Sequence, residues 1–418
     1  MNTEYEETLN IVRKAIKWLK EIQNRNDGGF PGNKPGQRSG LWTTAGVILA
    51  LLQCGEKVDD TVLNGVRFLI DPNNQNADGG WSTSIKDERS VTEPTAWTVW
   101  AFSEFAKEYD KIKEWEFFEK FKESFRRGVY WLLWSNETGG NPPREDGAWS
   151  SNIYDEKSRT LCTSLAVRAL LESKEAFRRI DSTVYDKIGN EIVKKVENAV
   201  KWLTSTDIYK CGYWAWTSGE EKGSIVATAH ALLSIIDATQ DRDTRVKDAS
   251  SILKSSIRWL KAQQDGSGKW ENELEDRNAG WICLDFFATP WVILALIKGR
   301  EKIYDFNILQ GVVWLRENFD KTKGYWQFNG KEMYTWPTSD AIYPLNLYLA
   351  LGEKENETTY NTILSLARKL GSYKVYKSAI SKLEMVVTGL SATIVWLLAG
   401  MFSIYYSCLL YTSDAADE

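Results

Sequence analysis

Acidic residues stand beside aromatic ones at three places in this sequence. Glu93 opens the stretch Glu-Pro-Thr-Ala-Trp, Asp285 is followed by two phenylalanines, and Asp340 lies four residues after Trp336. Burying an unpaired carboxylate is unfavourable, and an apolar cavity can keep a carboxyl protonated so that it serves as a proton donor. We therefore take Glu93 and Asp285 as candidate catalytic residues and Asp340 as a candidate ligand-binding residue.

Glu93 also has a purely structural interpretation. The order Thr92-Glu93-Pro94 fits the start of a helix, where proline is accommodated and a carboxylate interacts favourably with the helix dipole. The residue pattern leaves the catalytic and the structural interpretation of Glu93 open.

Tryptophan is unusually frequent, with 20 residues in a chain of 418. One set follows turn glycines closely and is predicted to pack between outer helices: Trp81, Trp149, Trp214, Trp270 and Trp326. A second set lies beside the starts of apolar segments and is expected to line a central cavity, where aromatic faces hold an apolar chain or stabilise a carbocation. These candidate substrate-binding residues are Trp42, Trp97, Trp281, Phe287, Trp291 and Trp336.

The composition argues against several kinds of chemistry. The single histidine, His230, lies inside an apolar segment, and no histidine follows the Cys283-x-Asp285 pair, so we predict no metal site and no cofactor. No Gly-rich phosphate-binding loop occurs. The net charge of −5, without a basic block, argues against nucleic-acid binding, and five scattered cysteines indicate reduced thiols.

A sixfold internal repeat organises the chain. Six amphipathic segments end in an aromatic residue followed by leucine, for example IVRKAIKWL at 11–19 and KVENAVKWL at 195–203. After each comes a Gly-plus-aromatic turn, and then an apolar segment that starts at or near a threonine. These threonines are Thr44, Thr95, Thr163, Thr228, Thr289 and Thr338.

Each repeat therefore predicts one half-exposed helix and one helix buried on every side. Six buried helices can close into an inner barrel with the six amphipathic helices around it, since a closed ring needs no capping repeats. We predict an all-α fold, an α/α toroid of six helical hairpins over residues 1–355, with no strands of consequence.

This repeat resembles that of squalene–hopene cyclases, oxidosqualene cyclases and protein prenyltransferase β-subunits, and so implies a place in the terpene cyclase/prenyltransferase superfamily. In class II cyclases of this superfamily, the central Asp of an Asp-x-Asp-Asp-Thr-Ala motif donates the proton. Aligned on Thr95, the sequence places Glu93 at the donor position, with Val91 and Pro94 instead of the flanking aspartates. Aligned on Thr289, it keeps only Asp285, the first aspartate of the motif.

The resemblance implies a protein that binds an isoprenoid or other apolar lipid and cyclises or isomerises it by acid catalysis. Because the acid motif is incomplete, protonation of an epoxide or an allylic leaving group is expected to be easier than protonation of an alkene. The alternative is a non-catalytic sensor module that binds a ligand or a protein partner and is coupled to a membrane helix or an effector. The sequence leaves open whether the protein is an enzyme.

The C-terminal part of the chain has a different character. Residues 385–411 contain no charged residue, and Lys374, Lys377 and Lys382 precede them. This pattern predicts a helical linker at 356–384 and a transmembrane segment at 385–406, with the toroid anchored to the membrane and facing the cytoplasm. Residues 407–418 resemble a translated sequencing-adapter tail.

Overall fold

The computed structural model describes residues 3–85, 87–134, 139–246, 249–276, 280–283, 285–327 and 332–352, and for the described part of 273–287 it describes the backbone alone. All of them belong to one compact unit, Met1–Leu364. A second unit, Ser365–Glu418, lies outside the described residues, as do the predicted linker, transmembrane segment and adapter tail. Among the described helices, none has the length and apolar character needed to cross a bilayer.

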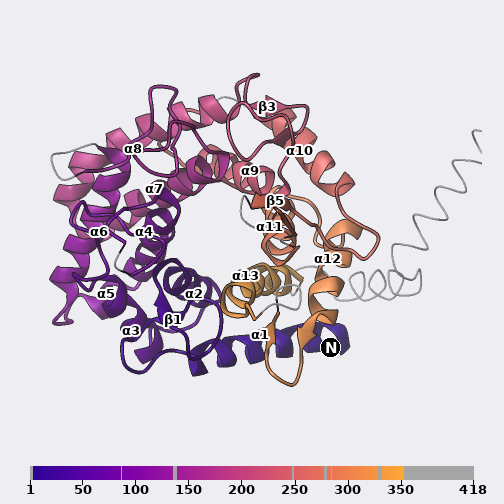
Figure 1. The fold of residues 1–418 in the computed structure, drawn as a ribbon, viewed down its shortest axis with the longest axis horizontal. Helices are drawn as coiled ribbons and strands as arrows, with labels where there is room; N and C mark the ends of the chain where they lie inside the picture. The colour runs from indigo at the N-terminus through magenta and orange to yellow at the C-terminus, as the bar shows by residue number, and fades with distance from the viewer. Residues whose placement is uncertain are drawn as a thin grey trace, which may run out of the picture. The chain divides into compact units, whose positions relative to one another are not determined.

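Six helices stand side by side around a central axis and form the inner barrel of the unit (Figure 1). Each inner helix packs against the next, and the last packs against the first, so the ring is closed. Contacts on every side account for their nearly continuous apolar sequences. The inner helices are α2 (Leu41–Gln53), α4 (Thr92–Ala106), α7 (Thr160–Ile180), α9 (Ile225–Gln240), α11 (Asp285–Lys298) and α13 (Thr335–Gly352).

Six amphipathic helices surround the barrel (Figure 1). In the first of them, Arg13 and Lys17 are exposed whereas Val12 and Leu19 are buried, as the sequence pattern predicts. The first outer helix packs on α13, so the N-terminus closes the outer layer. The outer helices are α1 (Thr3–Glu21), α3 (Asp60–Leu69), α6 (Phe118–Leu133), α8 (Ser182–Leu203), α10 (Ser250–Ala262) and α12 (Phe306–Glu317), and a single turn, α5 (Tyr109–Ile112), precedes α6.

The described strands are few and short, in keeping with the prediction of no strands of consequence. The described residues contain four antiparallel two-stranded hairpins. These are too short to form a layer of the fold. The pairs are β1 (Phe30–Pro31) with β2 (Ser39–Gly40), β3 (Tyr209–Lys210) with β4 (Tyr213–Trp214), β5 (Glu273–Asp276) with β6 (Gly280–Cys283), and β7 (Phe319–Asp320) with β8 (Tyr325–Trp326). In two of them, β3–β4 and β7–β8, the Gly-aromatic turn joins the strands.

The recurring threonines tie each turn to its inner helix, and we call them the latch threonines. In the second repeat the backbone N–H of Trp81 donates to Oγ1 of Thr95 at 2.9 Å, and the other five repeats make the same bond at 2.9–3.1 Å. The latch threonines thus lie in the first turn of the inner helices, which begin two to four residues earlier than the apolar segments of the sequence predict. The reason is that the hydroxyl satisfies a donor of the turn and does not cap the helix.

The tryptophans that follow the turn glycines fasten the inner and outer layers together. The indole N–H of Trp81 donates to the carbonyl of Leu69 at the end of α3, at 3.0 Å. Trp149, Trp214, Trp270 and Trp326 make the equivalent bond to the last or next-to-last leucine of their outer helices at 2.6–3.0 Å. All five are fully buried, and each bond satisfies one of the helix-terminal carbonyls. Their predicted packing role is confirmed.

The turn glycines cannot be replaced for two reasons. Gly79 has a φ of +98°, a region that disfavours residues with a Cβ. A Cβ on it would also lie 2.9 Å from the carbonyl oxygen of Arg127, in the next outer helix. Gly268 repeats both features, with a φ of +96° and 2.6 Å to the carbonyl oxygen of Gln310. Each turn therefore fixes the spacing between consecutive repeats.

Candidate functional site

The interior of the barrel is filled in layers that can be counted from the latch threonines. In each inner helix we compare four positions: two residues before the latch threonine, and two, five and nine residues after it. Consecutive positions in this series are three or four residues apart, so all four share one helix face. Trp97 of α4 and Trp291 of α11, both at the second position after their threonines, have ring centroids 5.5 Å apart. These helices stand three places apart in the ring of six, so the shared face points to the barrel axis.

We call the two outermost layers the mouth layer and the ring layer. Within the mouth layer, two residues before the latch threonines, the rings of Trp42 and Trp336 are 6.5 Å apart. Position 93 belongs to this layer too. The ring layer, two residues after the threonines, contains Trp97, His230, Trp291 and Asp340. Together the layers hold most of the candidate residues found in the sequence.

Glu93 lies in the first turn of α4 and is half-buried. Burial raises the pKa of its carboxyl to about 7, although a hydrogen bond from the side chain of Trp97 opposes this effect. Pro94 is the third residue of the helix, where its missing N–H is not needed. Both interpretations of Glu93 therefore have support, because it opens the helix and also titrates near neutrality.

Asp340 lies in α13 and is also half-buried. Burial raises the pKa of its carboxyl to about 8; the indole of Trp291, whose Nε1 is 3.3 Å from Oδ2, opposes this shift, and the charge of Glu93 adds to it. Two carboxyls from distant parts of the sequence thus interact at the mouth of the barrel. At neutral pH this pair retains at least one proton, which is the condition for a general acid.

Aromatic side chains close the space around this pair. A small cavity of about 10 Å³, close to the room one water molecule needs, lies beside Asp340. A ligand larger than water therefore needs at least one of the described lining side chains to move. The cavity is lined by Trp42, Thr43, Gly46, Trp97, Trp336, Ser339 and Asp340.

His230 belongs to the ring layer, where it lies among tryptophan rings. Its ring centroid is 4.5 Å from that of Trp291 and 6.5 Å from that of Trp97. Burial and the nearby charge of Arg168 hold the pKa of the imidazole well below its usual range, so His230 is neutral.

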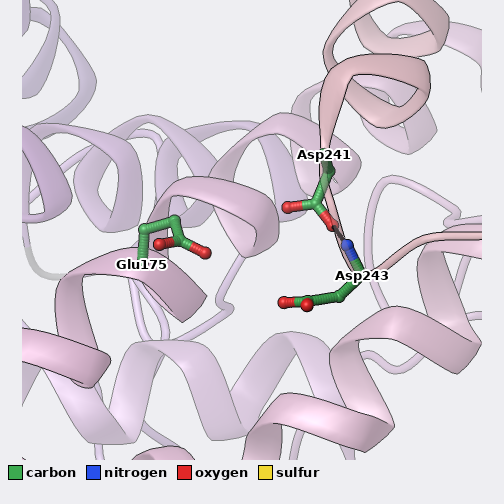
Figure 2. Close-up of side chains that lie close together, drawn as sticks. All are labelled: Glu175, Asp241 and Asp243. Atoms are coloured by element: carbon green, nitrogen blue, oxygen red, sulfur yellow. Dashed lines mark hydrogen bonds between the residues drawn. The ribbon is translucent and has the colours of Figure 1, made fainter.

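Three carboxylates at the other end of the barrel come close enough together to hold a cation. Figure 2 shows Glu175 on α7 facing Asp241 and Asp243, which follow α9; among the described residues this is the one such group. The ammonium of Lys174, which is fully buried, lies 2.7 Å from Asp241 and 2.8 Å from Asp243. These oxygens already neutralise a buried cation, so they serve the packing of α7 against α9.

Three candidate residues lie where the backbone alone is described. Asp285 is the first residue of α11, Phe287 occupies the mouth-layer position of the same helix, and Trp281 belongs to β6. Their side chains lie outside the described residues, so the catalytic role of Asp285 and the binding roles of the other two stay predictions.

The chain belongs to the prenyltransferase α/α toroid domain family, whose pattern matches residues 2–92 and 140–274, more than half of the chain. Among solved structures it is similar to the type II terpene cyclase MstE from Scytonema (TM-score 0.50, 13% identity, 83% of this chain and 99% of that chain). It is also similar to a cellobiose 2-epimerase from Bacillus thermoamylovorans (TM-score 0.58, 15% identity, 83% and 99%).

A possible member of the GH105 family from Salmonella enterica shares the fold as well (TM-score 0.54, 13% identity, 83% of this chain and 94% of that chain). No curated protein matches the sequence. At these identities the likeness establishes the toroid, so the activity has to be argued from the mouth of the barrel.

Proposed function

We propose that the toroid binds an isoprenoid or another apolar lipid at the mouth of its inner barrel and isomerises or cyclises it by acid catalysis. The observation that carries this proposal is the meeting of Glu93 and Asp340 among tryptophan rings. Indole faces attract both apolar chains and positive charge, so Trp42, Trp97, Trp291 and Trp336 suit a ligand on which a carbocation develops.

The acid pair favours a particular proton acceptor. Raising the pKa of a carboxyl keeps it protonated but makes it a weaker acid, so an oxygen is a better acceptor than an alkene. In the proposed step the proton of Glu93 moves to an epoxide oxygen, the C–O bond breaks with its electron pair on oxygen, and the positive charge on carbon faces the indoles. Loss of a proton from carbon to the Glu93 carboxylate completes an isomerisation that needs no co-reactant.

The second candidate function is a non-catalytic sensor. It is favoured by the closed mouth, where the cavity beside Asp340 has room for about one water molecule. In that case ligand entry would displace Trp42 or Trp336, and the movement of these rings would itself be the signal.

Membrane attachment is a separate part of the proposal. It is supported by the charge-free run at 385–411 and by the lysines that precede it, which favour a cytoplasmic toroid. Carbonate extraction of membranes from cells that express the full chain tests it. Retention in the membrane pellet is expected, and release into the soluble fraction would contradict the attachment.

Native mass spectrometry with three probes tests the ligand class. Oxidosqualene and squalene are expected to bind, whereas cellobiose is not, although a fold relative is a cellobiose 2-epimerase. Binding of cellobiose alone would overturn the proposal in favour of a carbohydrate site. Chromatography of the bound lipid then separates the two candidates, because an isomer of unchanged mass supports catalysis and unaltered lipid supports the sensor.

A further inference from the structure

The barrel contains a fully buried arginine below the ring layer. Arg168 is at the fifth position after its latch threonine, and its guanidinium lies 4.0 Å from the ring centroid of Trp100, in the same layer. Its Nε donates to Asp237 at 2.8 Å. Within the part of the chain that the structure describes, Nη1 and Nη2 have no hydrogen-bond partner.

Such an arrangement is unfavourable unless a ligand completes it. A buried donor without an acceptor destabilises a protein by roughly 1–3 kcal/mol, and more for a charged group. Because Nε already meets Asp237, the two terminal nitrogens are left as an end-on fork. This fork matches two oxygens bonded to one carbon, the geometry of a carboxylate.

The charges around the fork disfavour a ligand with more than one negative charge. Asp237 also accepts from Lys298 at 3.1 Å, so this trio carries one excess positive charge. Lys107 is paired with both Glu104, at 2.7 Å, and Glu172, at 3.1 Å, so this second trio carries one excess negative charge, and its Glu104 also interacts with Lys298. The two trios balance, so a diphosphate would lack the countercharge that it needs.

The interior is least crowded beside α2, between the mouth and this arginine. The ring-layer position of α2 is Gly46, which has no side chain, and a Cβ built there would be in van der Waals contact with Ser339 Oγ alone, at 3.9 Å. A ligand chain that enters on this side has to enlarge the cavity of about 10 Å³ that Gly46 lines. From the mouth layer to the Arg168 layer is seven residues, or about 10 Å along a helix. A chain passing Gly46 would have one end at Glu93 and Asp340 and the other at Arg168.

We propose that the ligand of this toroid is an apolar carboxylic acid whose carboxylate is bound end-on by Arg168, with its hydrocarbon chain passing Gly46 to the acid pair. This inference rests on the proposed function and adds the head group to it. Arg168 is a binding residue in this account, and it lies too deep to act on the mouth end of the chain.

Fluorescence titration with farnesoic acid and farnesol at pH 7 tests the inference, with the tryptophans of the mouth and ring layers as reporters. Wild-type protein is expected to bind the acid about 10- to 100-fold more tightly than the alcohol, as for other hydrogen bonds to a charged group. Arg168→Lys should reduce this preference to a few-fold, because it keeps the charge and loses the fork. Gly46→Leu should weaken both probes alike while leaving Arg168 in place.

The outcomes are distinct. Equal binding of acid and alcohol by wild-type protein would overturn the carboxylate anchor and leave the proposed lipid site standing, whether or not the arginine variant folds. Binding of neither probe would overturn the lipid site and the anchor together. An unchanged preference in folded Arg168→Lys would place the recognition of the carboxylate elsewhere.

Discussion

Replacing Asp340 by asparagine should change how the stability of the protein depends on pH. Asparagine keeps the shape of the side chain and an oxygen that can accept from the indole of Trp291. The native pKa of Asp340 is raised from 3.8 to about 8, so between pH 5 and 8 the native state holds a proton that the unfolded state has released. Raising the pH through this window therefore destabilises the wild-type protein, and the variant lacks this contribution.

The magnitude follows from the width of the window. Each pH unit corresponds to about 1.4 kcal/mol per proton, so three units give about 4 kcal/mol. The free energy of unfolding of Asp340→Asn, relative to wild type, should rise by about this amount from pH 5 to pH 8. Glu93, whose pKa is raised to about 7, and His230, whose pKa is lowered, contribute in both proteins and largely cancel in the difference.

Urea unfolding at several pH values measures the difference, and Asp59→Asn is the matched control. Burial alone would raise the pKa of Asp59, but hydrogen bonds from Lys20 and from the Val62 backbone outweigh it and lower the pKa. The stability that Asp59 contributes is lost only as the pH falls through the acid range. The difference in the free energy of unfolding between this control and wild type should therefore stay constant between pH 5 and 8. If the stability difference between Asp340→Asn and wild type did not change between pH 5 and 8 either, Asp340 would not hold a proton in this range, and the acid pair would lose its support.

Three further substitutions test the packing by urea unfolding. Thr95→Val removes the acceptor of the Trp81 N–H and should reduce stability by about 1–3 kcal/mol, and a change below about 0.5 kcal/mol would show that the latch is dispensable. Gly128→Ala places a methyl 2.6 Å from the Trp81 ring and should reduce stability by about 1–3 kcal/mol, whereas Gly32→Ala, whose methyl would meet nothing within 4 Å, should be nearly neutral. Lys174→Met leaves Asp241 and Asp243 without their buried cation and should reduce stability by about 3–5 kcal/mol. Unchanged stability would show that the carboxylates do not need the ammonium of Lys174.

The repeat itself could be predicted from the sequence because its signals are local. The aromatic-leucine ends, turn glycines and threonines recur at helical spacing, and the structure explains each by one bond, as with Leu69, Trp81 and Thr95. The starts of the inner helices were predicted two to four residues too late, because the recurring threonines mark the contact with the turn and not the first residue of the helix.

The acid pair could not be predicted in the same way. Glu93 lies before its latch threonine and Asp340 after its own, so they do not align when the repeats are compared. They meet because the two positions are four residues apart on one helix face and because α4 and α13 stand on either side of α2 in a closed ring. Arg168 was missed although it lies in the apolar run LCTSLAVRALL, because its burial depends on Asp237 and Trp100, which belong to the neighbouring helices.

Turnover of an epoxide-bearing isoprenoid tests the central claim most directly. Wild-type protein, Glu93→Gln and the packing control Trp81→Phe are each incubated with oxidosqualene, and the extracts are separated by gas chromatography with mass detection. The account predicts a product of unchanged mass and new retention time from wild type and Trp81→Phe, and none from Glu93→Gln. Equal product from Glu93→Gln, or unaltered substrate from folded wild-type protein that binds it, would contradict acid catalysis at the mouth of the barrel.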